Sequence, residues 1–191
     1  MSIILVAVAV MVLGGVVAWS AERSPGRSAA LGAGSAVAGC LLAMVPVWAV
    51  LGGATGWPVT GEPGTLSWAG GWGTPGLTLS FSLDGLSAWF LAAVLLLSLV
   101  SAVYGYGYLG AELPGHAAPG HVPRPAGAAW FCFNLLVASM ILVLTAASVL
   151  AFLLAWELMS LSSFFLVLFD HEKKEVREAG WIYLIATHLG T

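Results

Sequence analysis

Residues 149–169 form a largely apolar stretch of 21 residues with one charged side chain, Glu157, near its centre. A helix needs about 20 predominantly apolar residues to cross the hydrocarbon core of a bilayer, so the stretch predicts a transmembrane helix. An unpaired charged carboxylate at that depth costs about 2.5–3.5 kcal/mol on insertion scales. Glu157 is therefore a candidate functional residue, and the alternative is a protonated glutamate that only packs against a neighbouring helix.

The composition places the whole chain in the membrane. Of its 191 residues, 60% are hydrophobic and 8% are charged, whereas an average soluble domain has about 25% charged residues. We therefore predict an all-α, polytopic transmembrane helix bundle. The six basic residues form no patch, which argues against nucleic acid as a partner. Cys40 and Cys132 lie in apolar segments without metal-ligand spacing, so we expect no disulfide, no metal and no cofactor in this chain.

The apolar segments predict five complete spans and the start of a sixth, all in one transmembrane domain. Their approximate ranges are 3–19, 29–51, 83–103, 128–144, 149–169 and 179–191. The first segment lacks a positively charged n-region, so we interpret it as a retained helix rather than a cleaved signal peptide. Residues 145–148 must then form a tight turn. The sixth segment would need about seven more residues to cross, so we expect this sequence to be the N-terminal part of a longer chain.

The segments between the spans are predicted loops. Residues 52–82 are rich in glycine, proline and tryptophan, and their 77–83 end alternates apolar and polar residues as a strand does. The tryptophans of this loop suit a membrane interface, with ligand binding as the alternative. Residues 104–127 and 170–178 are predicted loops on the opposite side of the membrane from residues 52–82. His116 and His121 are five residues apart but have no third metal-ligating residue beside them, so we favour an ordinary loop over a metal site there.

The basic residues predict the orientation. All six fall in loops on one side of the predicted spans. They are Arg23, Arg27, Arg124, Lys173, Lys174 and Arg177. The positive-inside rule assigns that side to the cytoplasm, so the N-terminus and the loop over residues 52–82 are expected outside, in the periplasm or extracellular space.

Two ionisable residues near mid-membrane, Glu157 and His188, lie on consecutive predicted helices. Burial raises the pKa of a carboxyl group and a nearby cation lowers it, and histidine has an ordinary pKa of about 6.5. We therefore predict a proton-transfer pair, the alternative for His188 being a neutral histidine hydrogen-bonded within the bundle. Ser160, one turn after Glu157, is a candidate partner or water ligand unless it bonds back to its own helix. Asp84 is expected to cap the third span, which we favour over a role in an ion path.

The sequence over residues 153–191 resembles a known family. LLAWELMSLSSFFLVLFDHEKKEVREAGWIYLIATHLGT is similar to the proton-translocating antiporter-type membrane subunits shared by respiratory complex I, Mrp antiporters and membrane-bound hydrogenases. Residues 83–87 and 133–140 fit the same family. WELMSLSSF and THLGT resemble most closely the branch formed by the membrane subunits of hydrogenase 4 and formate hydrogenlyase, whereas the complex I large subunits have an arginine where this chain has His188.

The resemblance implies a role for Glu157 as the proton-channel glutamate of the fifth helix, which in the family works with a lysine on a later, broken helix. It implies a multi-pass subunit of the inner (cytoplasmic) membrane that translocates protons, or sodium ions, rather than performing redox catalysis itself. The implied partners are the lipid bilayer, other membrane subunits, and [NiFe]-hydrogenase and iron–sulfur subunits. The alternatives are an Mrp-type cation/proton antiporter subunit and a non-pumping membrane anchor of a hydrogenase.

Overall fold

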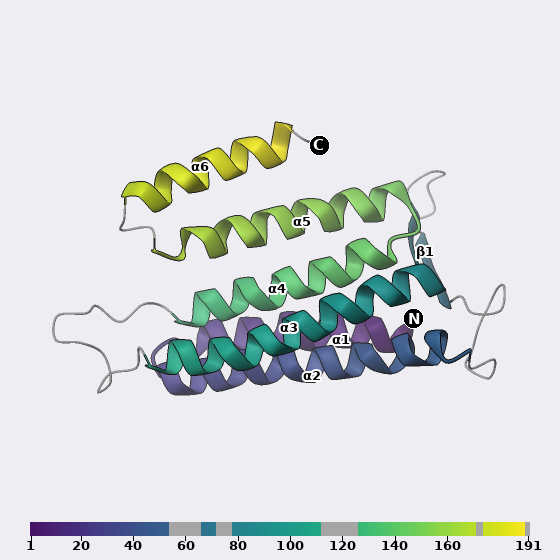
Figure 1. Ribbon diagram of the computed structural model, residues 1–191, viewed down its shortest axis with the longest axis horizontal. Coiled ribbons are helices and arrows are strands. Elements are labelled where there is room, and N and C mark those ends of the chain that lie inside the picture. The colour runs from purple at the N-terminus through teal and green to yellow at the C-terminus, as the bar shows by residue number, and fades with distance from the viewer. Residues whose placement is uncertain (54–65, 72–77, 112–125, 171–173, 190–191) are drawn as a thin grey trace.

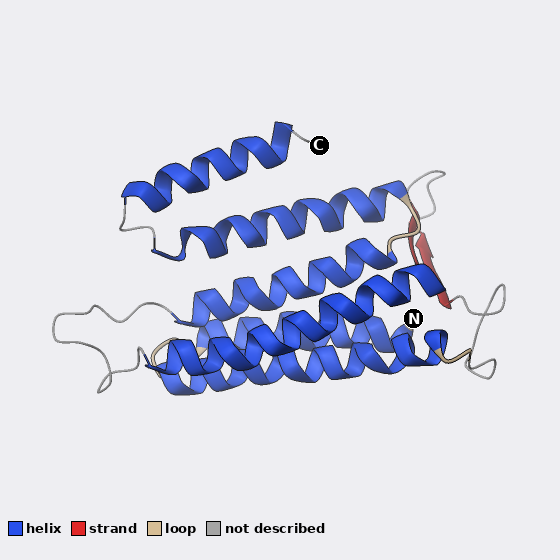
Figure 2. Cartoon of the chain, viewed as in Figure 1, coloured by secondary structure: helices blue, strands red, loops and turns tan. Residues whose placement is uncertain are grey.

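The computed structural model describes residues 1–53, 66–71, 78–111, 126–170 and 174–189. In these ranges the chain forms helices that run alternately up and down along one long axis, together with a small hairpin (Figures 1 and 2). The elements, in chain order, are α1 (Ser2–Ser20), α2 (Pro25–Leu51), β1 (Leu66–Gly71), β2 (Thr78–Leu83), α3 (Gly85–Ala111), α4 (Ala126–Thr145), α5 (Val149–Val167), the 3-10 turn η1 (Leu168–Asp170) and α6 (Lys174–Leu189).

Five helices of the described chain, α1 to α5, are long and apolar enough to cross a membrane. At about 1.5 Å per residue, even the 19-residue α1 and α5 extend close to 30 Å, the thickness of a bilayer's hydrocarbon core. The predicted all-α polytopic bundle is confirmed, and the protein is a multi-pass membrane protein.

The core of the bundle lies among α1, α2, α3 and α4. α2 packs against both α1 and α3, and α4 packs against α1 and α2. Glycines allow the closest approaches, because a Cβ added at Gly39 would overlap the Met11 side chain and one at Gly32 would overlap Trp130. Such small residues favour helix association in lipid. α5 packs on the far side of α4, and α6 lies beyond α5 (Figure 1).

The hairpin attaches to the turn between α4 and α5. β1 and β2 pair antiparallel, with Leu66 opposite Leu83. Phe81 of β2 is buried and forms a bridge with Ala146, whose neighbour Ala147 donates its N–H to the carbonyl of Ser80 at 2.8 Å. The strand predicted at residues 77–83 is confirmed over its described residues, 78–83, and the tight turn predicted at residues 145–148 is confirmed as well.

Several helices extend beyond the limits predicted from hydropathy. The loops predicted over residues 104–127 and 170–178 are wrong at residues 104–111, which belong to α3, and at residues 174–178, which open α6. Stacked Tyr104 and Tyr108 rings support the extra turns of α3, and Lys174 pairs with Glu178 at 3.6 Å in α6. Hydropathy indicates where the chain leaves the hydrocarbon core of the membrane. The helices continue past that point, because their backbone hydrogen bonds extend into the membrane interface. The remaining residues of the two loops, 112–125 and 171–173, lie outside the described chain.

Candidate functional site

The beginning of α5 is fixed by its cap. Ser148 precedes the helix in extended conformation, and its hydroxyl accepts hydrogen bonds from the N–H of Ala151 at 3.3 Å and of Ser80, in β2, at 3.4 Å. A serine at this position satisfies an N–H group that the first helical turn leaves unpaired. The same side chain therefore starts α5 and joins it to the hairpin.

Glu157 lies halfway along α5, eight residues after Val149, or about 12 Å along the helix axis. Its side chain is partly buried. Helical spacing places it on one face with Phe164 and beside Ser160, which is buried. A different face of α5, with Ala151 and Ala155, is buried toward the rest of the bundle. Glu157 thus stands on a side of α5 other than the one formed by Ala151 and Ala155.

Contacts along α5 and α6 define how the two antiparallel helices are aligned. The hydroxyl groups of Ser163 and Tyr183 lie 2.5 Å apart. Gly180 is buried, and a Cβ added there would lie 2.6 Å from the side chain of Leu168. Glycine at this position permits the close approach of α6 to the end of α5. The two helices diverge slightly toward the C-terminus of α6 (Figure 1).

A cleft of about 290 Å³ separates the two helices beyond the Ser163–Tyr183 contact. Its lining residues come from both helices. They are Trp156, Met159, Ser160, Tyr183, Ala186 and Thr187. Hydroxyl groups occur on both walls, although the Thr187 hydroxyl also donates to the carbonyl groups of Tyr183 and Leu184, at 3.0 Å each. The space is sufficient for several water molecules with polar partners.

The predicted site residues are distributed over this arrangement. Ser160 lines the cleft, and Glu157 is the residue after Trp156, which also lines it. His188 follows Thr187 in α6, so the register brings its helical turn opposite the turn of Trp156 and Glu157. The side chain of His188 lies outside the described part of the structure.

Asp84 lies at the start of α3 rather than in the cleft. Its Oδ1 accepts a hydrogen bond from the N–H of Ser87 at 2.7 Å, which is the geometry of a helix cap. This bond holds the pKa of the Asp84 carboxyl below its ordinary value, against a smaller opposing effect of burial. The predicted capping role is confirmed, and the structure does not bring Asp84 together with the mid-helix position of Glu157.

Sequence reasoning assigned no role to Asn134, which the structure places at the centre of the bundle. It is fully buried in α4 and donates from Nδ2 to the carbonyl groups of Gly32 and Trp130, at 2.9 Å each. Its Oδ1 accepts from the Ser35 hydroxyl at 3.2 Å. The available signal was the isolated amide in an otherwise apolar span, because such a group must find partners on neighbouring helices.

No group of three or more histidine, cysteine, aspartate or glutamate residues that could hold a metal occurs within the described ranges. The His116/His121 pair and the side chains of Trp57, Trp68 and Trp72 lie outside them.

Comparison with known proteins gives two partial matches. The chain is 38% identical over 120 residues to an uncharacterised protein of Mycobacterium tuberculosis, found in two strains, and the match covers 63% of this chain and 17% of that protein. It is 32% identical over 113 residues to hydrogenase-4 component B of Escherichia coli, covering 59% of this chain and 15% of that protein. The chain thus spans about one sixth of the length of these relatives. No protein-family model matches it.

Proposed function

We propose that this chain is part of a proton-translocating membrane subunit of a redox-driven complex related to hydrogenases and NADH dehydrogenases, with Glu157 as its proton-loading site. The observation that carries the proposal is the position of Glu157. It is a partly buried carboxylate halfway along a membrane-spanning helix, one residue after Trp156, which lines a cleft whose walls carry hydroxyl groups. An ionisable group at this depth is costly, so its presence favours a functional role.

The hydroxyl groups of the cleft support a proton path to the partly buried Glu157 carboxyl. Protons move along chains of hydrogen-bonded water and hydroxyl groups, and the Ser160 and Tyr183 side chains provide such groups on opposite walls. His188, on the neighbouring turn of α6, is the proposed second proton-transfer group, because imidazole titrates near neutral pH. Ser160 is proposed to hold water between them.

The partial match to hydrogenase-4 component B supports the redox-driven version of this function. By this likeness we propose an inner-membrane location and partners that include other membrane subunits, a [NiFe]-hydrogenase and iron–sulfur proteins. An Mrp-type antiporter and a non-pumping anchor are the competing functions, and they give different results in the experiment that follows.

The first prediction concerns Glu157→Gln in the complete protein, assembled with its partner subunits in sealed vesicles. Glutamine keeps the size and hydrogen-bonding capacity of the side chain but cannot exchange a proton at neutral pH. We expect redox-driven proton movement to fall by tenfold or more, as is typical when a positioned proton-transfer group is removed, on the order of 10²–10⁴ in rate. The measurement is the pH change recorded by a trapped dye on addition of the electron donor.

Glu178→Gln is the matched control, because Glu178 is an exposed carboxylate at the charged beginning of α6. It should leave proton movement unchanged. Wild-type proton movement in Glu157→Gln would show that Glu157 is not a translocation site, and an absence of redox-driven proton movement in the wild type would favour the membrane anchor. Sodium-dependent proton exchange in vesicles without an electron donor would favour the antiporter instead.

A further inference from the structure

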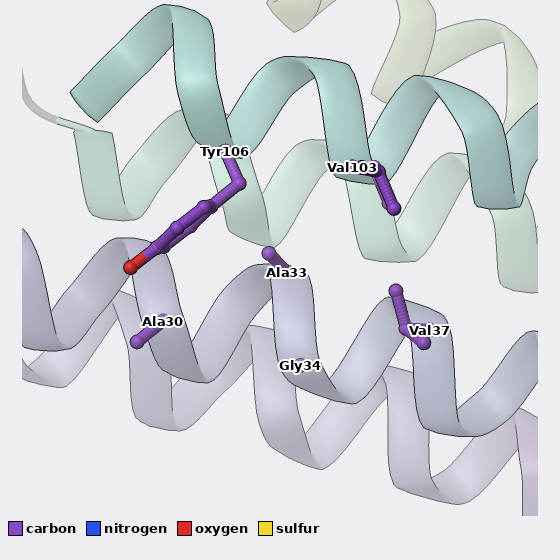
Figure 3. Close-up of a pocket in the computed structure, with 7 residues that line it drawn as sticks. Ala30, Ala33, Gly34, Val37, Val103 and Tyr106 are labelled. Atoms are coloured by element: carbon purple, nitrogen blue, oxygen red, sulfur yellow. The ribbon is translucent and has the colours of Figure 1, made fainter. Parts of the chain in front are cut away.

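The outer surface of the bundle carries an apolar groove between α2 and α3 with a volume of about 320 Å³. α2 contributes mainly small residues to the groove, and α3 contributes larger ones. The lining residues are Ala30, Ala33, Gly34, Val37, Ala102, Val103 and Tyr106. In Figure 3 the Tyr106 side chain reaches across from α3 to α2 and closes the groove at the end near Ala30, while Val103 faces Val37 farther along.

The groove has a packed floor. Ala33 and Ala102 are buried and belong to one core cluster with Trp130 of α4. Trp130 lies between the two walls, since a Cβ added at Gly32 of α2 would overlap its side chain and one added at Gly105 of α3 would lie 3.5 Å from it. The indole ring of Trp130 therefore separates α2 from α3 on the inner side of the groove. The groove is thus part of the packed fold.

The open side of the groove faces the bilayer. Val103 is 60% exposed and Tyr106 is 50% exposed, and a Cβ added at Gly34 would meet no atom within 4 Å. In a membrane-spanning bundle such a surface is in contact with acyl chains. An apolar, linear depression on it has the shape and chemistry to take one chain of a lipid.

The end of the groove near Ala30 is positively charged. Arg27 lies three residues before Ala30 and seven before Gly34, which places it on the same face of α2 one turn nearer the N-terminus, and it is exposed. Ser24 makes no side-chain cap at this N-terminus, so the positive end of the helix dipole adds to the charge of Arg27. The Tyr106 hydroxyl lies at the same end (Figure 3).

We infer that this groove binds an anionic phospholipid, with one acyl chain along Gly34 and Val37 and the phosphate at Arg27 and the Tyr106 hydroxyl. A basic residue at a membrane surface attracts acidic lipids, and the apolar groove continues directly from that residue into the hydrocarbon region. The charge of Arg27 selects the anionic lipid class, and the groove holds the acyl chain. This inference does not depend on the proposed proton-transfer function.

The test measures lipid binding to the complete protein purified in detergent, using native mass spectrometry with phosphatidylglycerol or phosphatidylcholine of identical acyl chains. Wild-type protein should retain one phosphatidylglycerol molecule in preference to phosphatidylcholine. Arg27→Gln should weaken phosphatidylglycerol binding about fivefold, the effect of one basic residue at a membrane surface, and leave phosphatidylcholine binding unchanged. Gly34→Leu fills the groove and should weaken binding of both lipids about tenfold or more.

Gly107→Leu is the control, because Gly107 is an exposed glycine of α3 with equally open space at its Cβ and no part in the groove. It should bind both lipids as the wild type does. Equal binding of the two lipids by the wild type would overturn the inference. An equal loss of lipid binding in Gly34→Leu and Gly107→Leu would also overturn it. Non-saturable binding in every variant would also overturn it, since the groove would then be filled by another helix or a second copy of the chain.

Discussion

Asn134 shows how a single polar residue organises this bundle. Its amide joins α4 to the carbonyl of Gly32 in α2, and its oxygen accepts from Ser35 on the same helix. α1 approaches at the same point, since a Cβ added at Gly15 would lie 3.2 Å from the Asn134 Cβ. Hydrogen bonds of this kind are worth about 0.6 kcal/mol on average in membranes and up to about 1.7 kcal/mol.

We predict that Asn134→Leu lowers the free energy of unfolding by about 1–2 kcal/mol, because it removes the hydrogen bonds that the amide makes with Gly32 and Ser35. The measurement is unfolding of the purified protein in mixed micelles of detergent and denaturing detergent, followed by circular dichroism. Ser35→Ala, which removes only the hydroxyl donor, should have the smaller effect. Equal stability of Asn134→Leu and the wild type would contradict a structural role for the amide.

Asp84 makes a pH-dependent prediction. The pKa of its carboxyl is lowered by the Ser87 N–H, so the cap stabilises the fold fully above the ordinary pKa of about 3.9 and loses this contribution as the pH falls through the lower folded value. Asp84→Asn keeps a capping oxygen without a titrating group. We expect the wild type to lose stability relative to Asp84→Asn on acidification below about pH 4.

Thermal unfolding of both proteins between pH 7 and pH 3 measures this difference. Asp84→Ala should be less stable than either protein at pH 7, by about 1 kcal/mol, since alanine cannot accept the Ser87 hydrogen bond. A difference between the wild type and Asp84→Asn that stays constant with pH would show that the carboxylate charge does not contribute to the cap.

At the scale of the helices, glycine has opposite effects in two places. Gly127 of α4 lies against the corner between α1 and α2, where an added Cβ would be 2.8 Å from the carbonyl oxygen of Ala18 and 3.0 Å from the Ser28 hydroxyl. That hydroxyl itself donates to the Ala18 carbonyl at 2.7 Å. Gly34 of α2, in contrast, has open space at its Cβ position.

We therefore predict that Gly127→Ala lowers the free energy of unfolding by about 1–3 kcal/mol, because backbone atoms cannot move aside for the methyl group. Gly34→Ala should raise it by about 0.5–1 kcal/mol, since alanine loses less conformational entropy in a helix. Both are measured by unfolding in the same micelles. Effects of the same sign would show that helix propensity, and not the fit at the α1–α2 corner, decides the outcome.

The helices themselves were predictable to different degrees. Each of the five complete spans predicted from hydropathy coincides with one of the helices α1 to α5, because an apolar segment of about 20 residues has few alternatives to a helix in lipid. Hydropathy placed the end of α3 and the beginning of α6 at least one helical turn too close to the membrane centre. Polar residues such as Tyr104 and Lys174 lower the local hydropathy but still adopt helical backbone conformation. The attachment of β2 to the turn at Ala146 and Ala147 depends on contacts between distant segments, which no local pattern contains.

At the scale of the whole molecule, the alternating helices separate the charges. The described basic residues, Arg23, Arg27, Lys174 and Arg177, lie where α1 meets α2 and α5 meets α6, at one end of the bundle, and the hairpin lies at the other (Figure 1). By the positive-inside rule, the basic end faces the cytoplasm. This orientation remains a prediction that labelling can test.

Two single-cysteine variants, Ala147→Cys and Lys174→Cys, provide the measurement in a background with Cys40 and Cys132 replaced by alanine. Both positions are exposed, at opposite ends of the bundle. A membrane-impermeant maleimide added to intact cells, with the outer membrane permeabilised where there is one, should label Ala147→Cys alone. Both should react after the cells are opened. Labelling of Lys174→Cys alone in intact cells would reverse the orientation.

The sequence by itself determined that this protein is a multi-pass helical membrane protein and that Glu157 is its most unusual residue. Hydrophobicity and the cost of a buried charge are properties of single segments and single residues, so they can be evaluated without a fold. Only the tertiary structure decided that Asn134 joins α4 to α2, that a cleft opens between α5 and α6 and that a groove forms between α2 and α3. These features arise where helices meet, and the alignment of one helix on another depends on how side chains interlock.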